Sequence, residues 1–174
     1  MDQNRCGLLV VYTGTGKGKT TAALGLALRA HGQGLRVGVV QFIKPAASVC
    51  GEHRALADLG IFVDVLGDGF SWQLGNHAAQ AQAAWQQVQA LITDGGLDML
   101  VLDEFTYPLA FKWIDPQMVI DWIKAHRPAG LHLVITGRDA PAVLLKSADL
   151  VTEMKEVRHP YRTRGLCAQA GIEY

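Results

Sequence analysis

The fold is decided by the stretch Tyr12-Thr-Gly-Thr-Gly-Lys-Gly-Lys-Thr-Thr-Ala-Ala-Leu-Gly25. It follows the apolar run 8–12 and leads into a segment with helical periodicity, so it predicts a strand, a glycine-rich loop and a helix, in that order. Its end, Gly18-Lys19-Thr20, matches the phosphate-binding pattern G-x-x-x-x-G-K-[ST]. Where that pattern requires its first glycine the chain has Thr13, and the glycine follows one position later at Gly14. We therefore interpret the stretch as a phosphate loop with an altered beginning.

The residue types in this loop suit a polyphosphate. Glycines let backbone N–H groups turn towards phosphate oxygens, and the helix that follows adds the positive end of its dipole. The lysine contacts the outer phosphates, and the threonine hydroxyl is a ligand for Mg²⁺. The alternative, a glycine-rich turn with incidental lysines, leaves the order of strand, loop and helix unexplained. The predicted nucleotide-binding residues are Gly14, Thr15, Gly16, Lys17, Gly18, Lys19, Thr20 and Thr21.

Length and composition exclude several protein classes. The chain has 174 residues, 49% of them hydrophobic, which fits one domain (1–174) with a single core. Its 16 Lys and Arg balance 16 Asp and Glu, so a dedicated nucleic-acid binder is disfavoured. The three cysteines lie far apart and are expected to be reduced thiols. No apolar run approaches the roughly 20 residues that span a bilayer, and no signal-peptide pattern begins the chain, so we expect no membrane contact and a cytoplasmic location.

Short apolar runs alternate with longer amphipathic ones along the chain. Runs that are apolar throughout are typical of strands buried on both faces, and hence of a parallel sheet covered by helices. The pattern therefore predicts a three-layer α/β fold, whose ligands bind at the carboxyl ends of the strands. The predicted strands are 8–12, 36–42, 61–66, 99–102, 131–136 and 150–154, and the predicted helices are 20–30, 52–59, 76–93 (capped by Asn76), one from Pro116, and 141–146.

Two acidic residues, Asp103 and Glu104, follow the very apolar run 99–102. A carboxylate in this position can hold Mg²⁺ opposite Thr20, directly or through water. On its own, an acid after an apolar run is more often a helix cap or a loop residue, but the upstream phosphate loop favours a metal role. The sequence does not decide which of the two carboxylates contacts the metal. It also leaves the reaction open, because Glu104 suits both hydrolysis and phosphoryl transfer.

Further motifs narrow the interpretation. With the loop, their order resembles the P-loop family of ATP:corrinoid adenosyltransferases, the cob(I)alamin adenosyltransferases, over nearly the whole chain. The G-x-G-K-G-K-T-T loop and the closing A-Q-x-G-I-[DE]-Y are the most selective of them. In order along the chain they are Gln41-Phe-Ile-Lys44, Gly67-Asp-Gly-Phe-Ser-Trp72, Val101-Leu-Asp-Glu-Phe-Thr-Tyr107, Ile135-Thr-Gly-Arg138, Ala148-Asp149, Val157-Arg-His159 and Gly165-Leu-Cys-Ala-Gln-Ala-Gly-Ile-Glu-Tyr174.

The resemblance implies a transfer of the 5′-deoxyadenosyl group of ATP to the cobalt of a reduced corrinoid, with release of triphosphate. It also implies a RecA-like P-loop NTPase fold with about six mainly parallel strands, a homodimer, and an electron donor such as a reduced flavoprotein. ATP is expected to lie in the loop in the reversed direction, so that the ribose faces the open cavity. Lys19 then acts on the departing triphosphate, with Mg²⁺ and the backbone N–H groups.

Four further side chains have two interpretations each. By the resemblance, Phe70 and Trp72 lie against the corrin and displace its lower axial ligand, whereas their i, i+2 spacing alone suggests core packing. Arg29 aligns with an arginine that contacts the nucleotide, or is a solvated charge at a helix end. His159 lines the corrinoid pocket, or lies in a surface turn. Arg138 is a weaker candidate on the rim formed by the strand ends.

The chain also departs from the family, because few residues precede its first strand and Pro45-Ala-Ala-Ser-Val-Cys50 is atypical. These differences bear on how the site closes rather than on its chemistry. Two other function classes stay open at this stage. One is a P-loop ATPase or kinase with a variant loop, and the other is a non-catalytic protein that binds a corrinoid or a nucleotide.

Overall fold

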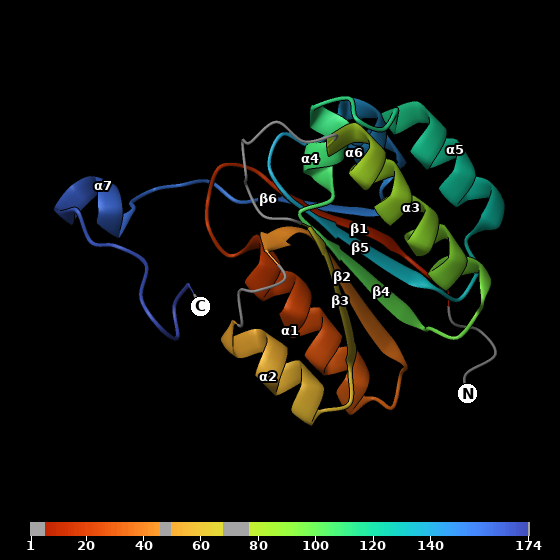
Figure 1. Cartoon of the computed structure of the whole chain (residues 1–174), viewed down its shortest axis with the longest axis horizontal. Helices are drawn as coiled ribbons and strands as arrows, with labels where there is room; N and C mark the ends of the chain where they lie inside the picture. The colour runs from red at the N-terminus through yellow and green to blue at the C-terminus, as the bar shows by residue number, and fades with distance from the viewer. Residues whose placement is uncertain (1–5, 46–49, 68–76, 174) are drawn as a thin grey trace.

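A six-stranded sheet, parallel throughout, forms the centre of the molecule (Figure 1). The computed structural model describes residues 6–45, 50–67 and 77–173. The strand order is β3-β2-β4-β5-β1-β6. The prediction of a parallel sheet is confirmed, and the order places the carboxyl ends of β4, β5 and β1 next to one another. The strands are β1 (Leu9–Thr13), β2 (Val37–Pro45), β3 (Phe62–Gly67), β4 (Met99–Asp103), β5 (His132–Thr136) and β6 (Leu150–Glu153).

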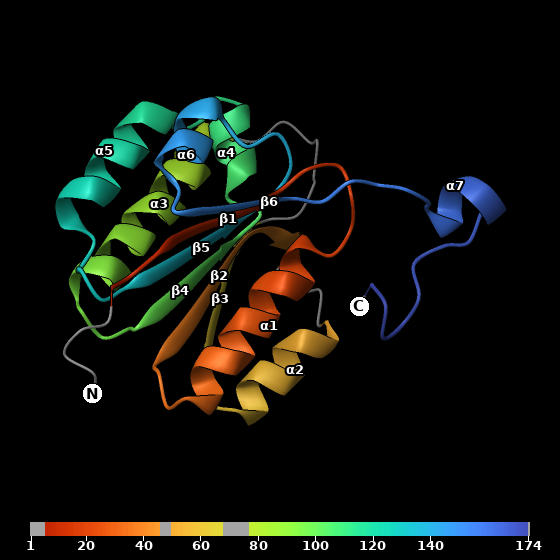
Figure 2. The same cartoon turned by 180° about the vertical axis from the view of Figure 1, so that it is seen from behind.

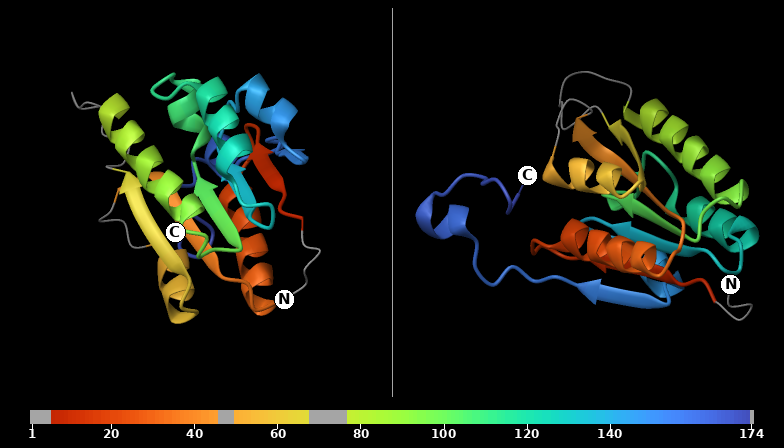
Figure 3. Two further views of the ribbon diagram at one scale, coloured as in Figure 1. Left: turned by 90° about the vertical axis from the view of Figure 1, so that its right-hand side faces the viewer. Right: turned by 90° about the horizontal axis from the view of Figure 1, so that it is seen from below.

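Helices cover both faces of the sheet, as Figures 1 and 2 show from opposite sides. On one face lie α1 (Lys19–Gly32) and α2 (Gly51–Asp58). On the other lie α3 (His77–Thr93), α4 (Thr106–Ala110), α5 (Pro116–His126) and α6 (Ala142–Ser147). The view along the sheet in Figure 3 shows the three layers, which confirms the predicted α/β class. Within the described ranges, none of the helices combines the length and apolar character needed to cross a bilayer.

The apolar strands bury side chains on both faces, which explains their continuous hydrophobic runs. All five residues of β4 are buried. Trp85 and Val88 of α3 and Ile120 of α5 belong to the core cluster on one face. On the other face Ala23 and Ala27, fully buried and one helical turn apart, bring α1 close to the sheet because their side chains are small. The phosphate loop is thus held between a buried strand and a closely packed helix.

The last strand, β6, differs from the others. All four of its residues are exposed, and the strand lies at the edge of the sheet beside β1. Beyond it the chain leaves the sheet, forms the short helix α7 (Pro160–Arg164), and turns back towards the phosphate loop (Figures 1 and 3).

The sequence interpretation contains neither α4 nor α7, which have only five residues each. The predicted helix cap Asn76 lies outside the described residues, and α3 begins at His77.

Candidate active site

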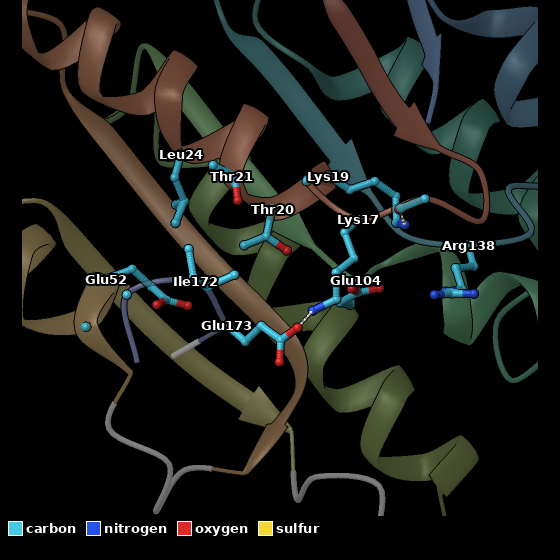
Figure 4. Close-up of a pocket in the computed structure, with 14 residues that line it drawn as sticks. Lys17, Lys19, Thr20, Thr21, Leu24, Glu52, Glu104, Arg138, Ile172 and Glu173 are labelled. Atoms are coloured by element: carbon cyan, nitrogen blue, oxygen red, sulfur yellow. Dashed lines mark hydrogen bonds and ion pairs between the residues drawn. The ribbon is translucent and has the colours of Figure 1, made fainter. Parts of the chain in front are cut away.

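The candidate site lies at the carboxyl ends of three neighbouring strands. The phosphate loop follows β1, Arg138 follows β5 and Glu104 follows β4, and these strands lie side by side in the sheet. Together they border a pocket of about 530 Å³ (Figure 4). The pocket is lined by residues 16–21, Leu24, Gly51, Glu52, Glu104, Arg138 and residues 171–173. Segments far apart in the chain therefore meet at the carboxyl edge of the sheet, as the sequence predicts.

Two glycines of the loop, Gly14 and Gly16, are also required because another segment of the chain packs closely against them. Gly14 has φ 96°, and a Cβ there would lie 2.5 Å from the carbonyl oxygen of Met154. A Cβ on Gly16 would lie 2.8 Å from the same oxygen and from the carbonyl carbon of Lys155. The Gly16 N–H also donates to the Met154 carbonyl at 2.6 Å. The chain leaving β6 thus passes directly over the loop, and only glycines leave room for it.

Lys19 is buried inside the loop that it belongs to. Its exposed fraction is 6%, and its Nζ donates to the carbonyl oxygens of Gly14 at 3.0 Å and Gly16 at 2.7 Å. Burial lowers the pKa of Lys19 below its ordinary value, and the carboxylates of Glu104 and Asp103 oppose that shift. The ammonium group is therefore largely shielded from water, and an arriving phosphate would interact with it more strongly than in bulk solvent.

The two adjacent carboxylates have different surroundings. Asp103 is fully buried, and its carboxylate accepts hydrogen bonds from Gln41 Nε2 at 3.1 Å and from the Thr136 hydroxyl at 2.7 Å. Gln41 Oε1 lies 2.6 Å from His53 Nε2, so the network reaches α2. The Thr136 oxygen also accepts from the Glu104 backbone N–H at 2.9 Å. Asp103 thus ties β2, β4 and β5 together and holds the backbone of its neighbour.

Glu104 is turned towards the pocket. Its φ of 60° lies in the left-handed region, which a non-glycine residue adopts only where its surroundings enforce it. The enforcement comes from both neighbours, because Asp103 is bonded on one side and Phe105 is fully buried on the other. The Phe105 ring centroid lies 4.6 Å from that of Phe42 and 5.3 Å from that of Trp85. Glu104 lines the pocket and Asp103 does not, which separates two carboxylates that the sequence leaves equivalent.

The residues present fit a magnesium ion that arrives with a nucleotide. The Thr20 hydroxyl and the Glu104 carboxylate line the same pocket, and both are hard oxygen ligands. Among the residues that the structure describes, no group of three or more His, Cys, Asp or Glu is arranged to hold a metal ion. Mg²⁺ typically takes one or two protein oxygens together with phosphate oxygens and water. The two hard oxygen ligands of the pocket therefore suit a Mg²⁺ ion that is carried by a nucleotide.

Comparison with known proteins decides among the function classes. The model of the family described as "ATP:corrinoid adenosyltransferase BtuR/CobO/CobP" matches residues 5–174. The chain belongs to this family. It is 42% identical over 175 residues to the corrinoid adenosyltransferase CobA of Salmonella typhimurium, covering 99% of this chain and 88% of that relative. It is 40% identical to the corrinoid adenosyltransferase of Pseudomonas aeruginosa, covering 97% and 84%. The protein is a corrinoid adenosyltransferase, and the predicted resemblance is confirmed.

A solved structure supports the fold independently of sequence. The flagellar accessory protein FlaH from Methanocaldococcus jannaschii superposes with a TM-score of 0.62 over 86% of this chain and 71% of that chain. At 12% identity the likeness concerns the fold alone. It confirms the predicted RecA-like P-loop architecture for this adenosyltransferase.

Several predicted site residues lie away from the pocket. Arg29 is in the last turn of α1, about 15 Å along the helix from Lys19 at the usual rise per residue. The ring of His159 accepts the Tyr161 N–H at 3.2 Å and caps α7. Among the described residues neither side chain lines the pocket, nor do Gly14 and Thr15 of the loop. Phe70 and Trp72 lie outside the described residues.

The pocket also contains residues that the sequence interpretation does not assign to it. Leu24, Gly51 and Glu52 come from α1 and α2, and residues 171–173 come from the far end of the chain. Glu173 forms an ion pair with Lys17, drawn as a dashed line in Figure 4. The closing A-Q-A-G-I-E-Y motif carries a signal for this placement, because it is one of the most selective stretches of the family resemblance. The periodicity of the sequence gives no indication that the motif returns to the phosphate loop.

Proposed function

We propose that this adenosyltransferase joins C5′ of ATP to the cobalt of a Co(I) corrinoid and releases the three phosphates as one triphosphate. The electron pair of Co(I) forms the Co–C5′ bond, while the C5′–O bond breaks and its electrons leave with the triphosphate. No general base is required, because no proton is removed from the nucleophile. The observation that carries the proposal is the pocket lined by Lys19, Thr20 and Glu104, whose cation, hydroxyl and carboxylate suit a polyphosphate that binds with Mg²⁺.

Each of these residues then has a definite task in the step. Lys19 and the loop N–H groups stabilise the negative charge that grows on the departing oxygen. Thr20 and Glu104 would hold Mg²⁺, which would supply further neutralisation of the phosphate charge. We propose that ATP lies in the loop in the reversed direction, so that its ribose faces the open side of the pocket. With ATP in this direction, the loop holds the triphosphate, which is the leaving group of the reaction.

We propose that Phe70 and Trp72 contact the corrin and displace its lower axial ligand. The family resemblance supports this role, and so does the chain order, since both residues follow β3. The carboxyl end of β3 lies on the same edge of the parallel sheet as the pocket. A cobalt ion without its lower ligand is more easily reduced from Co(II) to Co(I), so the aromatic residues would serve the reduction that precedes the transfer.

We further propose that the enzyme is a cytoplasmic homodimer of single-domain subunits and receives its electrons from a donor such as a reduced flavoprotein. Apolar side chains on the edge of the sheet support the dimer. Leu150 and Val151 of β6 are 43% and 44% exposed, and Val157 beyond it is 90% exposed. Exposed apolar residues next to an unpaired strand edge are typical of an interface between protein chains.

The cobalt side of the reaction tests this proposal. Under anaerobic conditions, the wild-type protein with Mg-ATP and chemically reduced cobalamin should give the absorbance spectrum of an adenosylated corrinoid. Lys19→Ala should reduce the rate at least about 100-fold, because the leaving group loses its buried cation. The ATPase alternative would be favoured instead if the cobalt spectrum stayed unchanged while ATP was consumed.

The proposed role of Phe70 and Trp72 is tested by comparing reactions that begin from Co(II) and from Co(I) corrinoid. Trp72→Ala should slow the reaction that begins from Co(II) with a reductant more than the reaction that begins from Co(I). The reason is that only the first route needs the lower ligand displaced. Equal losses in the two assays would argue against a role in reduction.

A further inference from the structure

The C-terminal arm, defined here as residues 154–173, begins and ends at the phosphate loop. At its beginning the Met154 carbonyl accepts the Gly16 N–H at 2.6 Å. At its end the Glu173 carboxylate pairs with the Lys17 ammonium group. Between these points the arm leaves the body of the protein, as Figures 1 and 2 both show. The loop that binds phosphate is thus in contact with both ends of one exposed segment.

A tight turn directs the end of the arm into the pocket. The N–H groups of Ile172 and Glu173 donate to the Gln169 carbonyl at 3.2 and 2.9 Å, and Gly171 takes the left-handed φ of 77° that the turn requires. The Glu173 side chain is only 16% exposed, whereas that of Lys17 is 49% exposed. In Figure 4 the Glu173 carboxylate points at Lys17 from the side opposite α1. The carboxylate is therefore held at the loop rather than free in solution.

The charged side chains that line the pocket bear on the role of the Glu173 carboxylate. The described lining residues include three cationic side chains, Lys17, Lys19 and Arg138, and three carboxylates, Glu52, Glu104 and Glu173. The pocket is formally neutral, although its loop is built for a polyanion. A phosphate group that bound the Lys17 ammonium group would have to displace the Glu173 carboxylate from it. Carboxylate and phosphate therefore compete for the same ammonium group.

We infer that Glu173 sets the affinity of the loop for polyphosphate, competing with it for Lys17 and so favouring release of the triphosphate product. The inference rests on the proposed function in so far as triphosphate is the product. Glu173 acts through Lys17 and is not itself a catalytic residue. A loop that stabilises a leaving triphosphate also binds that product tightly, and a competing carboxylate limits the resulting inhibition.

Binding of inorganic tripolyphosphate tests the inference without adenosyl transfer. Glu173→Gln keeps the shape of the side chain and removes its charge, so calorimetry with Mg²⁺ should show a dissociation constant about two- to five-fold lower than in the wild type, the size expected for a partly exposed ion pair. Glu156→Gln is the matched control. Glu156 pairs with Arg162 at 3.1 Å within the arm and does not line the pocket, so this variant should bind as the wild type does.

A second variant shows whether the effect passes through Lys17. Lys17→Gln should weaken tripolyphosphate binding, and adding Glu173→Gln to it should leave the dissociation constant unchanged, because the cation for which carboxylate and phosphate compete is absent. Unchanged or weaker binding in Glu173→Gln would overturn the inference, as would equal tightening in the Lys17→Gln background. A wild-type protein that does not bind tripolyphosphate would overturn both the inference and the proposed leaving group. Binding that is indifferent to Glu173 would overturn the inference alone.

Discussion

Asp103 and Glu104 are adjacent in the chain but face different surroundings. The sequence predicts an acidic strand end opposite Thr20 and leaves the two carboxylates equivalent. Their difference comes from partners distant in the sequence: Gln41 on β2 and Thr136 on β5 both donate to Asp103. These contacts exist only once the order of the strands is set, and a local pattern contains no information about them. We therefore assign Asp103 to positioning and propose Glu104 as the metal ligand.

If Asp103 is a positioning residue and Glu104 a metal ligand, substitution of Asp103 should mainly lower stability and substitution of Glu104 should mainly lower turnover. Glu104→Gln should leave the unfolding free energy nearly unchanged and lower Mg²⁺-dependent turnover about 100-fold or more, since a ligand for the metal is lost. Asp103→Ala should lower the unfolding free energy by about 2–3 kcal/mol, because two buried donors lose their acceptor. Urea denaturation and steady-state assays measure both effects. The reverse pattern, with Glu104 the structural residue, would refute the assignment.

At the scale of elements, the phosphate loop is bounded by the chain that follows β6. The strand, loop and helix are predictable from sequence because glycine spacing, Gly-Lys-Thr and helical periodicity are all local. The close passage of Met154 and Lys155 over Gly14 and Gly16 is not, since about 140 residues separate the contacting segments. The alternating glycines, which the sequence predicts for phosphate binding, thus also leave room for the chain beyond β6 to cross the loop.

A pair of glycine substitutions tests this packing. Gly16→Ala should destabilise the protein by about 1–3 kcal/mol, because the new methyl group would lie 2.8 Å from the backbone of Met154 and Lys155. Gly25→Ala is the control, in the same region of sequence but inside α1 with nothing within 4 Å of the added carbon. It should stabilise the protein by about 0.5–1 kcal/mol. Thermal melts compare the two, and equal shifts would contradict the close passage.

At the scale of the whole molecule, the three-layer fold was predictable and the composition of the pocket only partly so. The parallel sheet follows from strands such as 99–102 that are apolar throughout, and the family motifs indicate the adenosyltransferase. The strand order depends on pairings between distant segments. The return of Ile172 and Glu173 to the loop depends on the path of an exposed arm that has no hydrophobic pattern of its own. Sequence periodicity reports burial, so it does not predict such a path.

In the proposed reaction the triphosphate held by the loop leaves in one piece as the cobalt–carbon bond forms. Phosphorus NMR of the products tests it most directly, after an anaerobic reaction of the wild-type protein with Mg-ATP and an excess of Co(I) corrinoid. We predict inorganic triphosphate in an amount equal to the adenosylated corrinoid, and no ADP. ADP with orthophosphate, or pyrophosphate with orthophosphate in place of intact triphosphate during a single turnover, would contradict the account.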